Sequence, residues 1–370
     1  MAKRVLFILT GLYRNGAVLS TLTTIKHLDR EKFVPELFVL EPGEAWPELL
    51  EGTPVTYGLR AGERLKRTPQ VLLQLLARVW HVVRRADILV GGLEMAPTFL
   101  VVVLGKLTGK PSVGFVRNSL PELLKTLQRR YTTLTKRLYP GVTRVVAISQ
   151  GIQESVEAMI PSLRGRVRTV YIPLELDVVQ RRAQEPLPVG APAGPYLVAV
   201  GRLEAQKGFD VLVRAYARLR EGGVTPPLVI VGEGDERDAL RGLAHTLGVA
   251  EHVIFAGFQA NPYPWLRGAA VFVSSSRFEG FCRVIAEALA VGTPVVATDC
   301  PSGPAEVLEN GQAGLLVPNE DADALAEALR RLLGDRALQG KLSRYGPERA
   351  RAFLPATTVR AFEAVLSELG

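Results

Sequence analysis

Short apolar runs alternate along the chain with longer stretches in which apolar residues recur at helical spacing. Runs rich in Val, Ile and Leu predict β-strands at residues 4–9, 34–40, 87–91, 111–116, 144–148, 196–200, 227–231, 253–256, 270–274 and 294–298. The spacing between them predicts helices at residues 17–28, 67–84, 97–107, 150–160, 207–220, 236–247, 283–291, 321–333 and 357–369. Strands and helices that alternate in this way form parallel sheets covered on both faces, so we expect a doubly wound α/β fold.

One stretch interrupts the alternation. Residues 180–195, QRRAQEPLPVGAPAGP, contain several prolines and no apolar period, and a fresh strand follows them. The sequence therefore predicts a Rossmann-like domain over residues 1–178, a linker over 179–195, a second Rossmann-like domain over 196–354, and a terminal helix over 355–370 that packs back onto the first domain. A chain of 370 residues suits two domains of ordinary size.

The stretch SRFEGFCRVIAEALAVGTPVVATD places two acids around the start of a predicted helix. Glu279 lies in the turn before the helix, and Glu287 lies inside it, opposite the apolar stripe. Both carboxylates could accept hydrogen bonds from the hydroxyls of one extended ligand. The backbone N–H groups at the helix start favour a phosphate or sugar oxygen, and they belong to Gly280, Phe281 and Cys282. The alternative is that Glu279 caps the turn and Glu287 is an ordinary solvated charge.

Two cations form a second candidate site in the stretch GRLEAQKG. A predicted strand ends at Gly201, Arg202 follows it, and Lys207 opens the next helix. Two cations at a strand end can hold a diphosphate, Arg202 with a planar fork and Lys207 as a mobile point charge. The alternative is a surface pair beside Glu204. Gly16, in the loop before the first helix, would let the backbone approach an anion, although strand-to-helix turns use glycine in any case.

Charge and composition narrow the choice of partners. The formal net charge of +8 favours an anionic partner, but aromatic residues are only 7% of the chain and no nucleic-acid recognition module is visible. The two cysteines form no disulfide framework, which fits a reducing cytosol. The four histidines show no metal-ligand spacing. We therefore expect no metal, no cofactor and no nucleic-acid partner.

The motifs above resemble a known family. GRLEAQKG, followed by FEGFCRVIAEALAVGTPVVATDCPSGPAEVL with its Glu-x7-Glu spacing, is similar to the retaining glycosyltransferases of family four over about residues 196–320. The resemblance implies the GT-B fold, in which two Rossmann-like doubly wound domains face each other across a cleft. The segment TDCPSGPAEVL is similar to the branch that builds bacterial polysaccharides and lipid-linked oligosaccharides, many of whose members use UDP-sugars.

The resemblance also implies roles for the candidate residues. Glu279 would hold hydroxyls of the donor sugar, and Glu287 would hold the ribose hydroxyls of the nucleotide. Arg202 and Lys207 would neutralise the diphosphate leaving group, which Gly16 would approach from the N-terminal domain. The remaining donor-binding candidates are Gly201, Gly280, Phe281 and Cys282.

The chain departs from the family pattern on the acceptor side. Many relatives have a histidine at the end of a central N-terminal strand, where this chain has Arg117 and Asn118. Arg117 could contact a phosphate or could be structural.

As a whole, the resemblance implies a metal-independent enzyme. It would move a hexose or N-acetylhexosamine from a nucleotide sugar, with UDP favoured, to a lipid-linked glycan in polysaccharide or cell-envelope glycan synthesis. A UDP-sugar epimerase of the same fold and a non-catalytic nucleotide-sugar-binding protein remain alternatives.

Basic residues concentrate in two N-terminal segments, 60–85 and 117–144. Each holds seven basic residues and one acidic residue. Basic runs that also contain Leu, Val and Trp80 suit a helix lying on anionic lipid, although a solvated helix over the core would look similar. The sequence thus predicts a cytoplasmic protein, peripheral on the inner face of the cell membrane.

Overall fold

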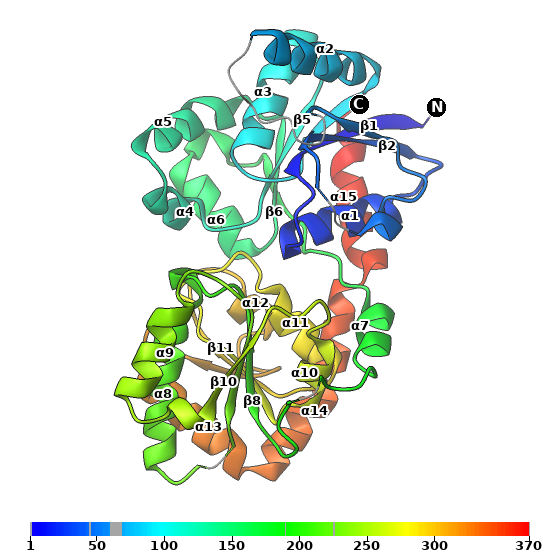
Figure 1. The fold of residues 1–370 in the computed structure, drawn as a ribbon. Helices are drawn as coiled ribbons and strands as arrows, with labels where there is room; N and C mark the ends of the chain where they lie inside the picture. The colour runs from blue at the N-terminus through cyan, green and yellow to red at the C-terminus, as the bar shows by residue number, and fades with distance from the viewer. Residues whose placement is uncertain (1, 44–45, 60–68, 189, 225, 370) are drawn as a thin grey trace. The chain divides into compact units, whose positions relative to one another are not determined.

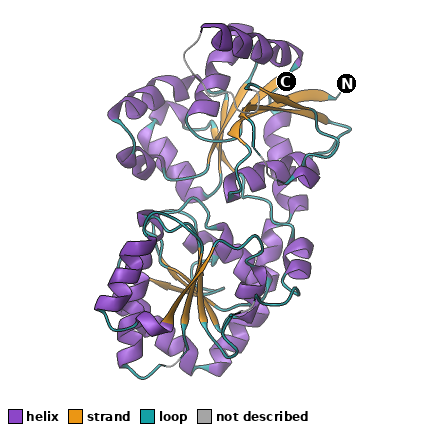
Figure 2. Cartoon of the chain, viewed as in Figure 1, coloured by secondary structure: helices purple, strands orange, loops and turns teal. Residues whose placement is uncertain are grey.

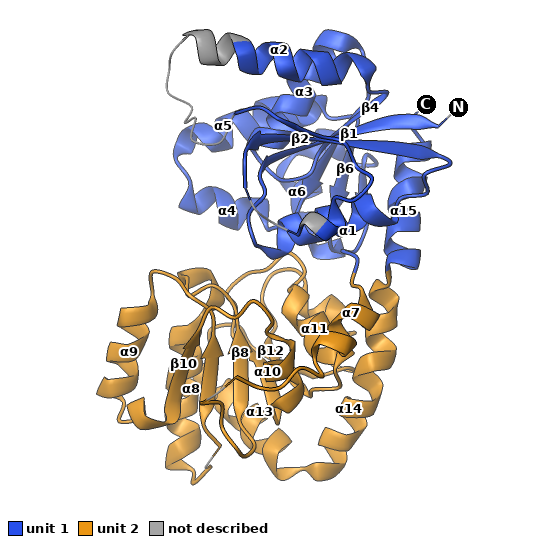
Figure 3. Cartoon of the chain, turned by 45° about the vertical axis from the view of Figure 1, so that its right-hand side comes forward, with its two compact units in different colours: residues 1–173, 355–370 blue, residues 174–354 orange. Residues whose placement is uncertain are grey.

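The chain folds into two compact units. The computed structural model describes residues 2–43, 46–59, 69–188, 190–224 and 226–369, with the backbone alone for residues 47 and 69–73. Unit 1 comprises residues 1–173 and 355–370, and unit 2 comprises residues 174–354 (Figure 3). Each unit is a parallel sheet flanked by helices (Figure 2), as the alternation of strands and helices predicts.

The sheet of unit 1 has the order β3-β2-β1-β4-β5-β6-β7. Its central strands are almost entirely apolar because both faces are covered, and Val5 to Leu9 of β1 are each at most 1% exposed. The order reverses between β1 and β4, so the carboxyl ends of these two strands lie side by side. The strands are β1 (Lys3–Gly11), β2 (Phe33–Glu41), β3 (Val55–Tyr57), β4 (Ile88–Gly91), β5 (Ser112–Val116), β6 (Arg144–Ala147) and β7 (Val167–Thr169).

Helices cover both faces of this sheet. The first helix and the last, α1 (Gly16–His27) and α15 (Pro355–Ser367), pack together on one face, where Phe362 contacts Phe7 and Phe115 at ring-centroid distances of 6.1 and 5.2 Å. The C-terminal helix is therefore part of unit 1 (Figure 1). The other helices are α2 (Pro69–Arg85), α3 (Ala96–Thr108), α4 (Leu120–Thr126), α5 (Arg129–Leu138) and α6 (Gln150–Met159).

Unit 2 contains a parallel sheet of order β10-β9-β8-β11-β12-β13. The strands are β8 (Leu197–Val200), β9 (Leu228–Val231), β10 (Val253–Gly257), β11 (Val271–Ser274), β12 (Val295–Thr298) and β13 (Leu315–Val317). One buried hydrophobic cluster joins the sheet to α8 (Phe209–Glu221), α9 (Arg237–Thr246) and α13 (Ala322–Gly334). The remaining helices are α7 (Leu176–Arg182), α10 (Tyr263–Gly268), α11 (Arg283–Ala290), α12 (Pro304–Val307) and α14 (Arg336–Ala350).

The predicted linker over residues 179–195 is different in the structure. Its first residues lie in α7, which is buried through Leu176 and Val179 and packs against α10 and α11. The chain leaves unit 1 earlier, after Pro173. The prolines that suggested a linker begin only after this short helix ends.

No helix among the described residues is both long and apolar enough to cross a membrane.

Candidate functional site

The reversal of strand order in unit 2 determines where a ligand can bind. The chain runs outward from β8 through β9 to β10 and then returns to β11 on the other side of β8. In open α/β sheets ligands bind at the carboxyl ends of the strands beside such a reversal. Gly201 and Arg202 follow β8 at this edge, and Ser275 and Ser276 follow β11.

Lys207 and Glu279 form an ion pair at this position. Lys207 Nζ lies 2.5 Å from Glu279 Oε1, and the hydroxyl of Ser276 donates to the same oxygen at 2.7 Å. The Lys207 side chain is 20% exposed and that of Glu279 8%. Burial disfavours the charged lysine, but the Glu279 carboxylate outweighs this and raises the pKa of Lys207. The site therefore contains a half-buried ammonium that stays charged and can donate further hydrogen bonds.

Two glycines allow the loops of this site to approach closely. Gly208 has a φ of +59°, and a Cβ on it would lie 2.1 Å from the carbonyl oxygen of Ser275. The Ser275 hydroxyl donates to the carbonyl of Lys207 at 2.9 Å across the same contact. At Gly201 a Cβ would meet the aliphatic carbons of Lys207 at 3.4 Å, so the lysine stem lies along this glycine.

Arg202 is more exposed than Lys207. Its side chain is 67% exposed and donates to Glu204 at 2.6 Å, the pairing that the surface interpretation anticipated. The Arg202 charge is nevertheless near enough to work against protonation of Lys207. Both cations therefore belong to one electrostatic site, with Arg202 at its solvent side.

Glu287 is buried, which the sequence did not predict. It is 5% exposed, and its Oε1 accepts from Arg283 Nε at 2.8 Å and from the Tyr263 hydroxyl at 3.4 Å. Burial raises the pKa of Glu287, and the Arg283 guanidinium opposes that shift. A solvated surface charge is thus the wrong interpretation of this residue, because α10 and the first turn of α11 cover it.

The three residues before α11 are also buried. Cys282 precedes the helix in a left-handed conformation with a φ of +61°, and its thiol lies 3.6 Å from the hydroxyl of Ser274. Burial raises the pKa of that thiol to about 12, so it is protonated at neutral pH. The Phe281 ring packs edge-on against Phe353, and Gly280 completes the buried turn. The side chain of Phe281 is therefore part of the core of unit 2.

Gly16 is the first residue of α1 and is exposed. Asn15 caps the helix, accepting a hydrogen bond from the backbone N–H of Val18 at 2.9 Å. The loop lies at the carboxyl end of β1, beside the reversal of strand order in unit 1. Gly16 is thus at the edge where a ligand of this unit would bind.

Arg117 is enclosed in unit 1. It is 8% exposed and donates to the carbonyl of Gly92 at 2.8 Å and to the hydroxyls of Ser20 and Thr21 at 2.7 and 2.8 Å. Its guanidinium also lies 4.5 Å from the centre of the Phe115 ring. These contacts tie β5 to α1 and favour the structural role that the sequence left open.

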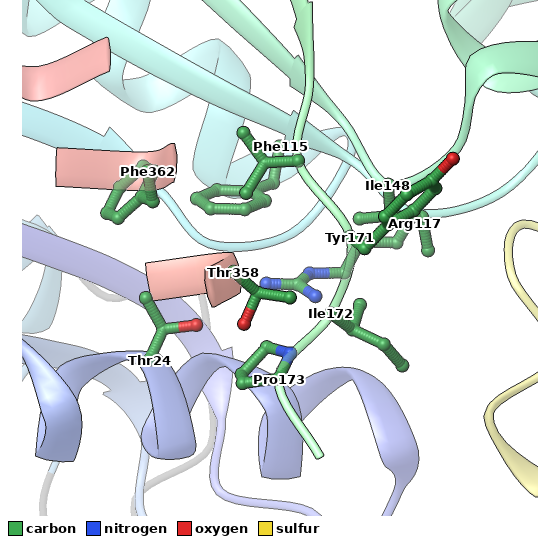
Figure 4. A pocket seen from close by; sticks show the side chains of 10 residues that line it. Thr24, Phe115, Arg117, Ile148, Tyr171, Ile172, Pro173, Thr358 and Phe362 are labelled. Atoms are coloured by element: carbon green, nitrogen blue, oxygen red, sulfur yellow. The ribbon is translucent and has the colours of Figure 1, made fainter. Parts of the chain in front are cut away.

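A small pocket adjoins Arg117. It is lined mainly by apolar side chains, and Figure 4 shows the guanidinium pointing among them. The lining residues are Thr24, Phe115, Arg117, Ile148, Val170, Tyr171, Ile172, Pro173, Thr358 and Phe362. Asn118, half-buried beside Arg117, accepts from the N–H of Ser119 at 2.9 Å.

Several contacts at the site lacked any signal in the sequence. Ser276 was one of three serines in a row, and Tyr263 lies 24 positions before Glu287, the acid it contacts. Arg283 stands one helical turn before Glu287, and this spacing is the signal that could have identified the pair. Within the described ranges, no three His, Cys, Asp or Glu side chains are grouped to hold a metal ion.

Comparisons with known families agree with the fold. Residues 15–175 match the model of a glycosyl transferase 4-like domain, and residues 189–349 match the model of glycosyl transferases group 1. Both models describe glycosyltransferase domains, and the two Rossmann-like units are the arrangement of the GT-B fold class. The chain belongs to the glycosyltransferases that resemble family four.

Individual relatives support this assignment. An N-acetylgalactosamine-N,N'-diacetylbacillosaminyl-diphospho-undecaprenol 4-alpha-N-acetylgalactosaminyltransferase from Campylobacter jejuni is 31% identical over 66% of this chain and 63% of the relative. The lipopolysaccharide core biosynthesis glycosyltransferase LpsE of Rhizobium meliloti is 37% identical over 55% of this chain and 58% of the relative. The matches thus span about three fifths of either relative.

Solved structures show the same fold along nearly the whole chain. Anabaena HepE in complex with UDP has a TM-score of 0.81 and 22% identity, and the match covers 99% of this chain and all of HepE. The sucrose-phosphate synthase of Thermosynechococcus elongatus has a TM-score of 0.77 and 21% identity, with 99% of each chain covered.

Proposed function

We propose that this protein is a retaining glycosyltransferase that uses a nucleotide sugar, preferably a UDP-sugar. It transfers a hexose or an N-acetylhexosamine to a lipid-linked glycan in polysaccharide or cell-envelope glycan synthesis. The observation that carries the proposal is the Lys207–Glu279 pair at the reversal of strand order in unit 2. A lysine that stays protonated beside a carboxylate suits a ligand in which a diphosphate is joined to a sugar. The ammonium can bind the diphosphate, and the carboxylate can accept hydrogen bonds from the sugar.

Each residue then has a distinct task in the transfer. Lys207 keeps one N–H on Glu279 and gives others to the diphosphate, while Arg202 neutralises that group from the solvent side. Glu279 accepts from hydroxyls of the donor sugar, and Glu287 from the ribose hydroxyls. As the bond from the anomeric carbon to the diphosphate breaks, the cations stabilise the charge that develops on the leaving oxygen. The acceptor hydroxyl attacks on the same face of the sugar and gives its proton to the leaving diphosphate oxygen, so the anomeric carbon retains its configuration.

The transfer needs no divalent metal in this proposal, because the two cations neutralise the diphosphate directly. We expect turnover to be unchanged by EDTA. Activity that disappears with EDTA and returns with magnesium or manganese would contradict this part of the mechanism.

The names of similar proteins support a UDP-sugar donor and a lipid-linked acceptor. HepE was solved with UDP and with UDP-glucose. The Campylobacter relative acts, by its name, on a diphospho-undecaprenol acceptor, and the Rhizobium relative acts in lipopolysaccharide core biosynthesis. A UDP-sugar donor and a lipid-linked acceptor are therefore the substrates to test first.

A lipid-linked acceptor would require contact with the membrane surface, and unit 1 offers suitable side chains. Helix α2 exposes Leu76 and Trp80, 53% and 42% exposed, and ends with the exposed Arg84 and Arg85. Helix α5 has no acidic residue and exposes four cations, Arg129, Arg130, Lys136 and Arg137. We propose that these helices bind anionic lipid on the inner face of the cell membrane. The first basic segment lies partly outside the described residues, at positions 60–68.

The deciding experiment supplies radiolabelled UDP-sugars with and without an undecaprenyl-diphosphate-linked glycan. Label that moves to the lipid fraction only when acceptor is present supports the proposal. Conversion of the sugar without acceptor would favour the epimerase, and binding without any turnover would favour a binding protein.

A further inference from the structure

Arg277 lies in the loop between β11 and α11, two residues before Glu279, and connects three segments of unit 2. Its guanidinium donates to both carboxylate oxygens of Asp210, at 3.0 and 2.9 Å. It also donates to Glu320 at 2.8 Å and to the carbonyl of Ala205 at 2.6 Å. Asp210 lies in the first turn of α8, and Glu320 lies between β13 and α13. One side chain thus joins this loop to α8, to the segment before α8 and to the loop before α13.

The backbone of the same loop is bonded to the segment that contains Lys207. The N–H of Arg277 donates to the carbonyl of Gln206 at 2.8 Å, and the Gln206 amide donates to the carbonyl of Phe278 at 2.9 Å. The Asn319 amide donates to the carbonyl of Arg277 at 2.9 Å. Gln206 precedes Lys207 and Phe278 precedes Glu279, so these bonds determine the separation of the two charged residues.

We propose that Arg277 is a positioning residue that holds Lys207 and Glu279 in register by clamping their two loops together. A guanidinium suits this role because its planar fork satisfies both oxygens of Asp210 and leaves further donors for Ala205 and Glu320. Arg277 does not touch the substrate in this scheme. It affects sugar transfer only by positioning the Lys207–Glu279 ion pair. The expected effect on turnover therefore rests on the proposed function.

The test compares Arg277→Gln and Asp210→Asn with a control, Arg218→Gln. Arg218 also joins α8 to a second element, pairing with Asp323 of α13 at 2.7 Å, but on an exposed surface. The first measurement is amide hydrogen exchange of the ligand-free protein over residues 203–209 and 275–282. Faster exchange in both segments in the two clamp variants, but not in the control, is the expected result. Unchanged exchange in both segments would overturn the clamp.

The second measurement is function. UDP affinity and kcat should both fall in the clamp variants, kcat by roughly tenfold to a hundredfold, because small misplacements of reacting groups have effects of this size. The double variant should be little worse than either single one, since the two side chains act as a unit. Faster exchange with unchanged kcat and UDP affinity would overturn the positioning role.

Failure of the proposed function and failure of a variant to fold can each be distinguished from failure of the clamp. If the wild-type protein neither binds UDP nor transfers sugar, the proposed function fails, while hydrogen exchange still decides whether the clamp exists. If Arg277→Gln does not fold, Arg277→Lys replaces it, since lysine keeps the charge without the fork. Full recovery of kcat and of loop protection by lysine would contradict the requirement for a planar fork.

Discussion

At the scale of single residues, the two cations of the site differ in how firmly they are held. Arg202 is mostly exposed, whereas Lys207 is enclosed beside Glu279. Arg202→Ala and Lys207→Ala should both weaken UDP binding, but only Lys207→Ala should also destabilise the fold. The loss should be about 1.5–3 kcal/mol, because a buried carboxylate loses its charged partner.

Calorimetry with UDP and thermal unfolding measure these two effects separately. The double variant Lys207→Ala/Glu279→Gln is the control, since it removes the unpaired charge and should recover part of the stability. Equal unfolding temperatures for the wild type and Lys207→Ala would show that the pair contributes nothing to stability.

Substitution of the two glutamates should affect UDP binding and turnover differently. Glu287→Gln should weaken binding of bare UDP, because ribose hydroxyls are present in every such ligand. Glu279→Gln should not weaken that binding and should instead lower kcat, because its proposed partners lie on the transferred sugar. UDP titrations and initial rates distinguish the two variants, and identical effects in both assays would contradict the assigned roles.

The sequence supplied the residue types of the site but not their contacts. Lys207 and Glu279 are 72 positions apart, and only the adjacency of β8 and β11 brings them together. For Arg117, the position in the sequence suggested a role that the contacts in the structure do not favour. An arginine at a strand end suggests an anion, but its partners are hydroxyls of α1 that no local pattern reveals.

At the scale of elements, the approach of α8 to β11 depends on one glycine. Gly208→Ala should lower the free energy of unfolding by more than about 2 kcal/mol, since a left-handed φ alone costs an L-residue about 1–2 kcal/mol. The clash with the Ser275 carbonyl adds to that cost. Gly248 is the control, because it has a φ of +69° and a Cβ added to it would meet nothing within 4 Å.

Denaturant unfolding of both glycine variants isolates the clash from the backbone strain. Gly248→Ala should show the strain alone, and kcat should be affected only in Gly208→Ala. Equal losses of stability in Gly208→Ala and Gly248→Ala would show that the loops at Gly208 and Ser275 can move apart without a cost in stability.

The hydrophobic pattern predicted the central strands and most of the long helices because each buries a continuous apolar surface. It missed β3, β7 and β13, which are three-residue strands at sheet edges and too short to show a period. It also missed the shorter helices α4, α5, α7, α10 and α12. The longest helix that it missed is α14, whose Gly346 and Pro347 are weak helix formers. A Cβ at Gly346 would lie 3.0 Å from the Leu289 carbonyl, so tertiary packing against α11 favours the glycine that local propensity disfavours.

At the scale of the whole molecule, the uneven charge leads to the last prediction. Reversing Arg84, Arg85, Arg129 and Arg130 to Glu should release the protein from anionic liposomes at low salt. Each cation near such a surface contributes roughly 1 kcal/mol, and salt screens this attraction. All four side chains are exposed, so the fold should survive the change.

The matched control reverses four exposed cations of unit 2, Arg331, Arg336, Lys341 and Arg344, which changes the net charge by the same amount. Liposome cosedimentation should show loss of binding for the unit 1 variant and retention for the control. Transfer to a short soluble acceptor should persist in both variants, because Lys207, Glu279 and Glu287 are untouched. Equal release of the two variants would mean that net charge alone governs binding, and equal binding of the wild type to neutral and anionic liposomes would remove the electrostatic argument. Either result leaves the transferase assignment in place, because that assignment rests on the family matches of both units and not on lipid binding.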